Sequence, residues 1–188
     1  MQQEVKKDIL NILKKSTKLI KENNTTKLKE LSNHTIHDAS IYQDEYSTTI
    51  AVLIYSLAKI FERTRYKKYK SWSLFYKTVL TTIKSSFKYL EKNQIENYEL
   101  EIQNLLNTIN KLEPKFRNYV QEVIKKAKIH KASRLHEHGI SIEKTASILG
   151  VNEWELMEYI GKTGISDVKQ SITKDIEERI KFARSLFK

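Results

Sequence analysis

The sequence predicts an all-α protein, with an N-terminal helical bundle followed by a C-terminal helix-turn-helix module. Apolar residues recur at intervals of three and four over long stretches, and no useful stretch alternates apolar with polar residues. The first 138 residues contain no glycine and only Pro114, whereas all four glycines follow them. Because glycine and proline interrupt helices, long helices are expected first and short ones afterwards.

Residues 1–113 are predicted to form the bundle, which is also where dimerisation or a partner contact is expected. Its first helix ends near the sequence KENNTT, whose asparagines and threonines suit a turn and a new helix start near residues 25–26. Residues 46–61 are apolar nearly all round, which is typical of a helix enclosed by others. Two further periodic helices, over residues 69–90 and 95–112, are joined near the sequence EKNQ.

Residues 114–165 are predicted to form the helix-turn-helix module, and residues 166–188 a final helix that packs back. Pro114 suits the first turn of a helix that runs to about His138, because its missing N–H costs nothing there. Glycines then recur every eleven residues, each suited to the left-handed position that ends a helix. They are Gly139, Gly150 and Gly161.

Residues 140–161, ISIEKTASILGVNEWELMEYIG, have the pattern of a helix-turn-helix. Such a motif needs a small residue where its helices approach, a glycine in the turn and apolar residues facing the supporting helix. These places are filled by Ala146, Leu149, Gly150, Val151, Leu156 and Tyr159. Ser141 is placed to cap the first helix, while Asn152 with Glu155 resembles a capping box on the second.

The longer stretch KASRLHEHGISIEKTASILGVNEWELMEYIGKTGI resembles a small prokaryotic helix-turn-helix family described as antitoxin-like. The likeness rests on the spaced Ala, Leu-Gly, Glu-Leu and final Gly-Ile, and it covers residues 125–165. The arrangement also resembles archaeal hypothetical proteins that place such a module after a helical region. This resemblance implies a three-helix module in a protein that regulates transcription or a partner, and it implies no catalytic residue.

The residues predicted to contact DNA lie on the helix before the module and on its second helix. They are Lys125, Lys126, Lys128, Lys131, Arg134, Asn152, Glu153, Trp154, Met157 and Lys162. The basic side chains suit phosphate contacts, and Asn152 suits adenine. Three glutamates on the second helix oppose its close approach to phosphates: capping explains Glu155 and the helix dipole Glu153, but neither explains Glu158. The main contact is therefore expected on the helix before the module.

The first functional hypothesis is a non-enzymatic DNA-binding protein of the transcription-regulator type. A formal net charge of +11 favours an anionic partner such as nucleic acid. The second hypothesis is an antitoxin-like or adaptor protein, in which Trp154 and Met157 meet a protein partner or a second copy of the chain. The alternative for this pair is burial against residues 166–188.

Positive charge is concentrated in two runs. The first contains no acid and holds Arg63, Arg65, Lys67, Lys68, Lys70, Lys77, Lys84 and Lys88. Its last four members lie along one side of a predicted helix, where they either follow a phosphate backbone or form a solvated face. Tyr66 and Tyr69, in the same run, are either stacking platforms or core residues. The second run, from Lys115 to Arg134, leads into the module and contains Glu122 as its one acid.

No catalytic residue, metal site or cofactor is predicted, and the chain has no cysteine. A third hypothesis, a metal-dependent helical hydrolase or nuclease, rests on His34, His37 and Asp38, which share a helix face. A hydrogen-bonded pair at the bundle edge is the simpler account. Arg134 and His138 are one residue short of the Arg-His spacing of helical ribonuclease toxins. No apolar run reaches the ~20 residues of a membrane span, so a cytoplasmic protein is expected.

Overall fold

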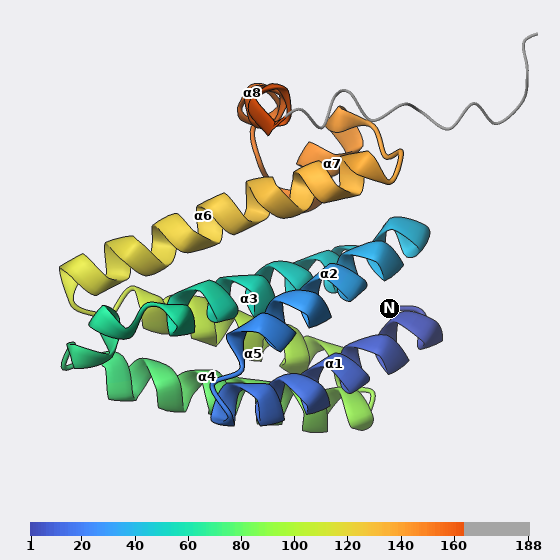
Figure 1. Cartoon of the computed structure of the whole chain (residues 1–188). Coiled ribbons are helices and arrows are strands. Elements are labelled where there is room, and N and C mark those ends of the chain that lie inside the picture. Colours follow the sequence, from blue (N-terminus) through green and yellow to red (C-terminus); the bar gives the residue numbers. More distant parts are fainter. Residues whose placement is uncertain (164–188) are drawn as a thin grey trace, which may run out of the picture.

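The computed structural model describes residues 1–163, except the side chain of Asp38 (Figure 1). The fold of this part of the chain is all-α and contains no β-strand, as the sequence predicts. The final helix predicted over residues 166–188 lies outside the described residues.

Five α-helices and one short 3-10 helix form the N-terminal part. They are α1 (Gln3–Lys21), α2 (Thr25–Tyr42), α3 (Glu45–Glu62), η1 (Thr64–Lys68), α4 (Trp72–Glu91) and α5 (Ile95–Ile109). The chain continues through α6 (Pro114–Glu137), α7 (Ile142–Leu149) and α8 (Glu153–Thr163). Helix α6 runs along the bundle (Figure 1), α7 and α8 pack against α6, and α7 also contacts α3.

Asparagine and glutamine turn the chain between the bundle helices, which contain no glycine. Asn23, Gln43 and Asn93 adopt left-handed backbone conformations, with φ of 51°, 49° and 59°. Asparagine tolerates this region better than most residues do, because its short polar side chain can form local hydrogen bonds. The side chains of Asn24 and Asp44 then accept hydrogen bonds from backbone N–H groups three residues ahead, at 3.1 and 2.8 Å, and so begin α2 and α3.

The first hydrophobic core lies between α1, α2, α3, η1, α4, α5 and the N-terminal half of α6. Helix α3 is enclosed, as its sequence predicts, since Ile50, Ile54 and Leu57 are all buried. Phe116 anchors α6 in this core. Its buried ring lies edge-on to that of Phe75, with 5.4 Å between the ring centroids.

A second hydrophobic core joins the C-terminal half of α6 to α7 and α8, and also to α2 and α3. Ala39, Ala51 and Ala132 are fully buried there, and such small side chains let helices pack closely. Leu156 and Ile160 contribute the buried face of α8. The C-terminal helices therefore share an apolar core with the bundle, which fixes the position of α8 relative to α3.

Candidate nucleic-acid interface

A tight turn joins α7 to α8. Gly150 ends α7 in the left-handed conformation, with φ of 57°, and the Val151 N–H donates to the Ala146 carbonyl at 3.0 Å. The Ser141 hydroxyl accepts from the backbone N–H of residue 144 at 3.2 Å, which confirms the predicted cap of α7. The Asn152 side chain accepts from the N–H groups of residues 154 and 155, at 2.9 and 3.3 Å, and caps α8.

Glu155 does not complete the predicted capping box. Its carboxylate instead forms an ion pair of 2.8 Å with Lys125 on α6. The remaining charged pairs in this region lie within single helices. They are Lys126 with Glu122 at 2.6 Å, Arg134 with Glu137 at 2.7 Å, and Lys162 with Glu158. Several side chains predicted to contact DNA are thus paired with carboxylates, although such exposed pairs are weak enough to be exchanged for phosphates.

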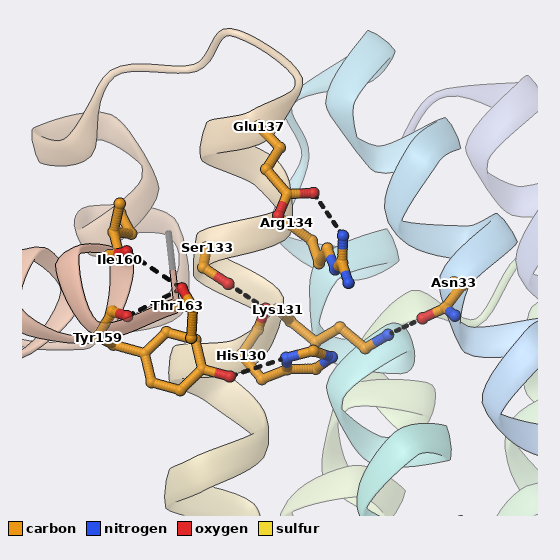
Figure 2. Close-up of polar contacts among 9 residues, drawn as sticks. All are labelled: Asn33, His130, Lys131, Ser133, Arg134, Glu137, Tyr159, Ile160 and Thr163. Carbon is orange, nitrogen blue, oxygen red and sulfur yellow. Dashed lines mark hydrogen bonds and ion pairs between the residues drawn. The ribbon is translucent and has the colours of Figure 1, made fainter. Parts of the chain in front are cut away.

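Lys131 does not lie on the surface that the sequence predicts for it. Its side chain has no exposed area, because it lies on the face of α6 that packs against α2 and α3. The ammonium donates to the Asn33 side-chain oxygen at 2.8 Å (Figure 2). It also lies 4.6 Å from the centre of the Tyr55 ring. Burial lowers the pKa of Lys131 to about 7, and the nearby Arg134 adds to this shift. Lys131 is therefore removed from the predicted phosphate-contacting set.

The outer face of α8 combines apolar and acidic side chains. Trp154 is 78% exposed and Met157 is 37% exposed, whereas the segment predicted to cover them lies outside the described residues. Glu153 and Glu158 are also exposed on this helix. Lys128, the remaining basic residue of the predicted set, is half-buried beside the turn at Gly150. The most exposed part of α8 thus presents no unpaired cation.

A groove of about 1010 Å³ lies between α3, η1, α6 and α8. Its charged and ring-bearing lining residues are Tyr55, Lys59, Glu62, Arg63, Arg65, Tyr66, Lys115, Tyr119, Glu122, Lys126, His130, Glu155, Glu158, Tyr159 and Lys162. Only Lys126 and Lys162 belong to the set that the sequence predicts to contact DNA. The two basic runs of the sequence meet here, because η1 brings the start of the first run beside the start of α6.

The groove has an excess of positive charge. Each of its four carboxylates is already paired with a lysine: three are the pairs given above, and Glu62 pairs with Lys29 at 2.9 Å. That hydrogen bond to Lys29 is the main cause of the lowered pKa of Glu62. Four lining cations form no ion pair with any described carboxylate. They are Lys59, Arg63, Arg65 and Lys115.

Aromatic side chains lie among these charges. Tyr119 stacks on Tyr66 with 3.7 Å between ring centroids, and its hydroxyl donates to the Lys59 carbonyl at 3.3 Å. His130 stacks on Tyr55, and its Nδ1 is joined to the Tyr159 hydroxyl by a hydrogen bond of 3.2 Å. Figure 2 shows Tyr159 and His130 side by side next to Lys131.

His130 is neutral at physiological pH. Burial lowers its pKa to about 4, and the positive charges of Lys131, Arg134 and Lys59 lower it further. The imidazole therefore adds no charge to the groove. It orders the rings of Tyr55 and Tyr159 instead, through one stacking contact and one hydrogen bond.

Two further expectations concern surfaces outside the groove. The predicted lysine row consists of Lys70, which precedes α4, and of Lys77, Lys84 and Lys88 on α4; all four are exposed and form no ion pair with a described carboxylate. Its contact with phosphates stays a prediction. His34 and His37 are exposed, and the His37 ring lies 5.1 Å from that of His138. No three metal-ligating side chains come together within the described part of the chain.

No protein-family model matches the chain, and no curated protein or solved structure is significantly similar to it. The resemblance of residues 125–165 to antitoxin-like proteins therefore stays a prediction. None of the helices between residues 1 and 163 is long and apolar enough to cross a membrane.

The residues of the groove that sequence reasoning missed come from elements far apart in the chain. Arg63 and Lys115 each appear in the sequence as the first member of a separate basic run, and Tyr119 appears as one more apolar position of a helix. The signal present in the sequence was the two basic runs themselves, one in the loop after α3 and one on α6. The two basic runs lie far apart in the sequence, and only the packing of α6 against α3 brings them to the same groove.

Proposed function

We propose that the protein binds nucleic acid without catalysing a reaction, as a DNA-associated regulator in which α7 and α8 form a helix-turn-helix module. The groove between α3, η1, α6 and α8 carries this proposal. It holds four cations that form no ion pair with a described carboxylate, placed among tyrosine rings and next to the predicted module. Phosphate contacts of this kind provide affinity that does not depend on base sequence and that falls as salt is raised.

Direct base reading by α8 contributes little to this function. The Asn152 oxygen already accepts two backbone N–H groups, so Asn152 is not free to form the bidentate contact that reads adenine. Glu153 and Glu158 would face phosphates with like charge. Helix α8 instead closes one side of the groove through Glu155, Tyr159 and other lining residues. The regulator is thus expected to bind with high salt sensitivity and modest sequence preference.

A titration with labelled random duplex, single-stranded DNA and RNA at two salt concentrations tests this function. The double change Arg63→Glu with Lys115→Glu should weaken binding by at least about tenfold and lower its salt dependence, because it reverses two unpaired charges of the groove. The matched control, Lys14→Glu with Lys15→Glu, makes the same charge change on exposed residues of α1. Equal loss in both variants would mean that only net charge matters, and the groove would lose its role.

The second candidate function is a protein-interaction module, and the exposure of Trp154 favours it. A tryptophan that is 78% exposed, three residues from a partly exposed methionine, is the kind of anchor that protein interfaces use. This candidate predicts negligible affinity for nucleic acid at physiological salt. It also predicts that Trp154→Ala abolishes self-association, measured by analytical ultracentrifugation, if the partner is a second copy. Salt-sensitive binding of nucleic acid by the Trp154→Ala variant would favour the first candidate.

A further inference from the structure

We infer that the groove takes an unpaired strand of nucleic acid, with a base stacked on the ring of Tyr119 and phosphates on the surrounding arginines and lysines. This inference rests on the proposed function and specifies the form of nucleic acid bound at the same site.

Tyr119 is the ring best placed to receive a base. It lines the groove, and Tyr66 is the one described ring that contacts it, stacking on a single face. Tyr66 is itself 8% exposed and stacks on Phe116, so Tyr119 rests on a rigid support in the first core. The Tyr55 ring differs, because His130 and the ammonium of Lys131 already occupy it.

The positive charges surround this ring. Arg63 and Arg65 are close enough to Tyr119 to oppose the rise in its pKa that burial causes. Lys115 lies four residues before Tyr119, on the same face of α6. Lysine and arginine beside an exposed aromatic face form the combination by which single strands are bound, with phosphates held by charge and bases by stacking.

The groove is long enough for several nucleotides. Its lining residues on α6 recur at intervals of three and four, so they form one line along the helix. They include Lys115, Tyr119, Glu122, Lys126 and His130. These positions span about 22 Å at the usual rise of a helix. A strand lying along this line would pass from the unpaired cations of η1 and α6 toward the paired charges beside α8.

A duplex does not use this geometry. Its bases stack on one another and present only their edges in the grooves, so an aromatic ring meets a base face only where the strand is unpaired. A duplex would instead have to approach an outer convex face such as that of α8, which carries exposed carboxylates. Unpaired bases on a phosphate backbone are present both in locally melted DNA and in RNA.

Fluorescence anisotropy with a labelled oligodeoxythymidine of about ten nucleotides tests the inference on the full chain. Oligouridine and a duplex of the same length are compared at the same salt. We expect the single strands to bind at least about tenfold more tightly than the duplex, and Tyr119→Leu to weaken strand binding by about tenfold or more. The slope of log affinity against log salt should stay unchanged in Tyr119→Leu, whereas Arg63→Gln should lower it by about 0.7.

Matched variants separate stacking from folding. Tyr119→Phe keeps the ring and should bind like the unchanged protein, while Tyr89→Leu removes a half-buried tyrosine from α4, outside the groove. Thermal unfolding of each variant identifies a temperature at which all variants are folded, and binding is measured at that temperature.

Two results overturn the inference in different ways. Duplex binding as tight as strand binding, with no effect of Tyr119→Leu, would reject it and leave the proposed function in place. The absence of binding to any nucleic acid at low salt would reject both. The ratio of the oligouridine and oligodeoxythymidine affinities then assigns the strand to RNA or to DNA.

Discussion

The two hydrophobic cores differ in what they bury with their apolar side chains. In the first core Tyr98 is neutral at physiological pH, because burial raises the pKa of its hydroxyl, and the buried Ser16 hydroxyl donates to a carbonyl of its own helix. In the second core region Lys131 is completely buried and has a side-chain oxygen, not a carboxylate, as its partner. Its neighbour His130 is also largely buried.

The stability of the protein should therefore depend on pH through the second core. An ionisable group that is taken out of water loses free energy in its charged form, so its titration is coupled to folding. The first core should therefore be insensitive to pH near neutrality. The second core, which positions α8 beside the groove, should change its stability over the range in which Lys131 and His130 titrate.

Phe116→Ala should have the largest effect and should break the first core. The Phe116 side chain is fully buried, and its ring contacts those of Tyr66, Trp72 and Phe75. Truncation of a buried phenylalanine lowers the free energy of unfolding by about 3–5 kcal/mol. Urea unfolding followed by circular dichroism measures this change. The loss should be the same at pH 6 and pH 9, and a strong dependence on pH would contradict the comparison of the cores.

Lys131→Met should stabilise the protein at low pH, because it removes the buried charge of the second core. The folded-state pKa of Lys131 is about 7, well below its usual value of 10.5, so the folded chain carries a buried charge below pH 7. Between pH 7 and 10.5 the unfolded chain binds the extra proton, and stability rises with pH. The variant removes this penalty and should gain about 1–4 kcal/mol at pH 6.

Urea unfolding at pH 10 tests whether the stability of the unchanged protein rises with pH, as the lowered pKa of Lys131 predicts. The difference between Lys131→Met and the unchanged protein should shrink there, because both folded states are then free of the charge. A stability of the unchanged protein that is flat from pH 7 to pH 10 would show that the Asn33 and Tyr55 contacts fully compensate the buried ammonium.

His130→Gln should reveal a second pH range, on the acidic side, in which the stability of the unchanged protein depends on pH. The folded-state pKa of His130 is about 4, against a usual value of 6.5, so the unfolded chain binds the extra proton between these values. Stability is complete above pH 6.5 and is lost as the pH falls toward 4. Relative to the variant, the unchanged protein should lose about 1–3 kcal/mol over this range. If the free energies of unfolding of the two proteins changed with pH in parallel, His130 would not contribute to the pH dependence.

The fold was predictable from the sequence to a greater extent than the site. Apolar spacing and missing glycines were enough for the all-α class and the enclosed helix α3, because helical periodicity is a local property. The caps at Ser141 and Asn152 were predictable for the same reason. The start of α4 at Trp72 was missed by a few residues, because the preceding residues form η1.

The position of Lys131 was not predictable, because it depends on which face of α6 meets the bundle. Helix α6 is covered on one side by α2 and α3 and on another by α7 and α8, so its apolar pattern does not mark a single buried stripe. A lysine within a basic run then looks exposed. The groove was missed for a related reason, since Arg63 and Lys115 come to line one groove only when α6 packs against α3.

The smallest expected effect belongs to the ion pair that joins the two helices flanking the groove. Lys125 and Glu155 lie 2.8 Å apart, but their side chains are 67% and 39% exposed, and such pairs contribute about 0.2–1 kcal/mol. A double-mutant cycle with Lys125→Ala and Glu155→Ala measures the coupling in urea at low and high salt. The exposed pair formed by Lys18 of α1 and the residue that caps this helix, Glu22, is the matched control.

A weak coupling, similar to that of the α1 pair and screened by salt, would mean that apolar contacts of Leu156 and Ile160 hold α8 in place. Lys125 could then exchange Glu155 for a phosphate at little cost, and the carboxylate would be no obstacle to nucleic acid. A coupling well above about 1 kcal/mol would contradict this, because the pair would then be part of the docking of α8 and phosphates could not displace it without loosening the second core.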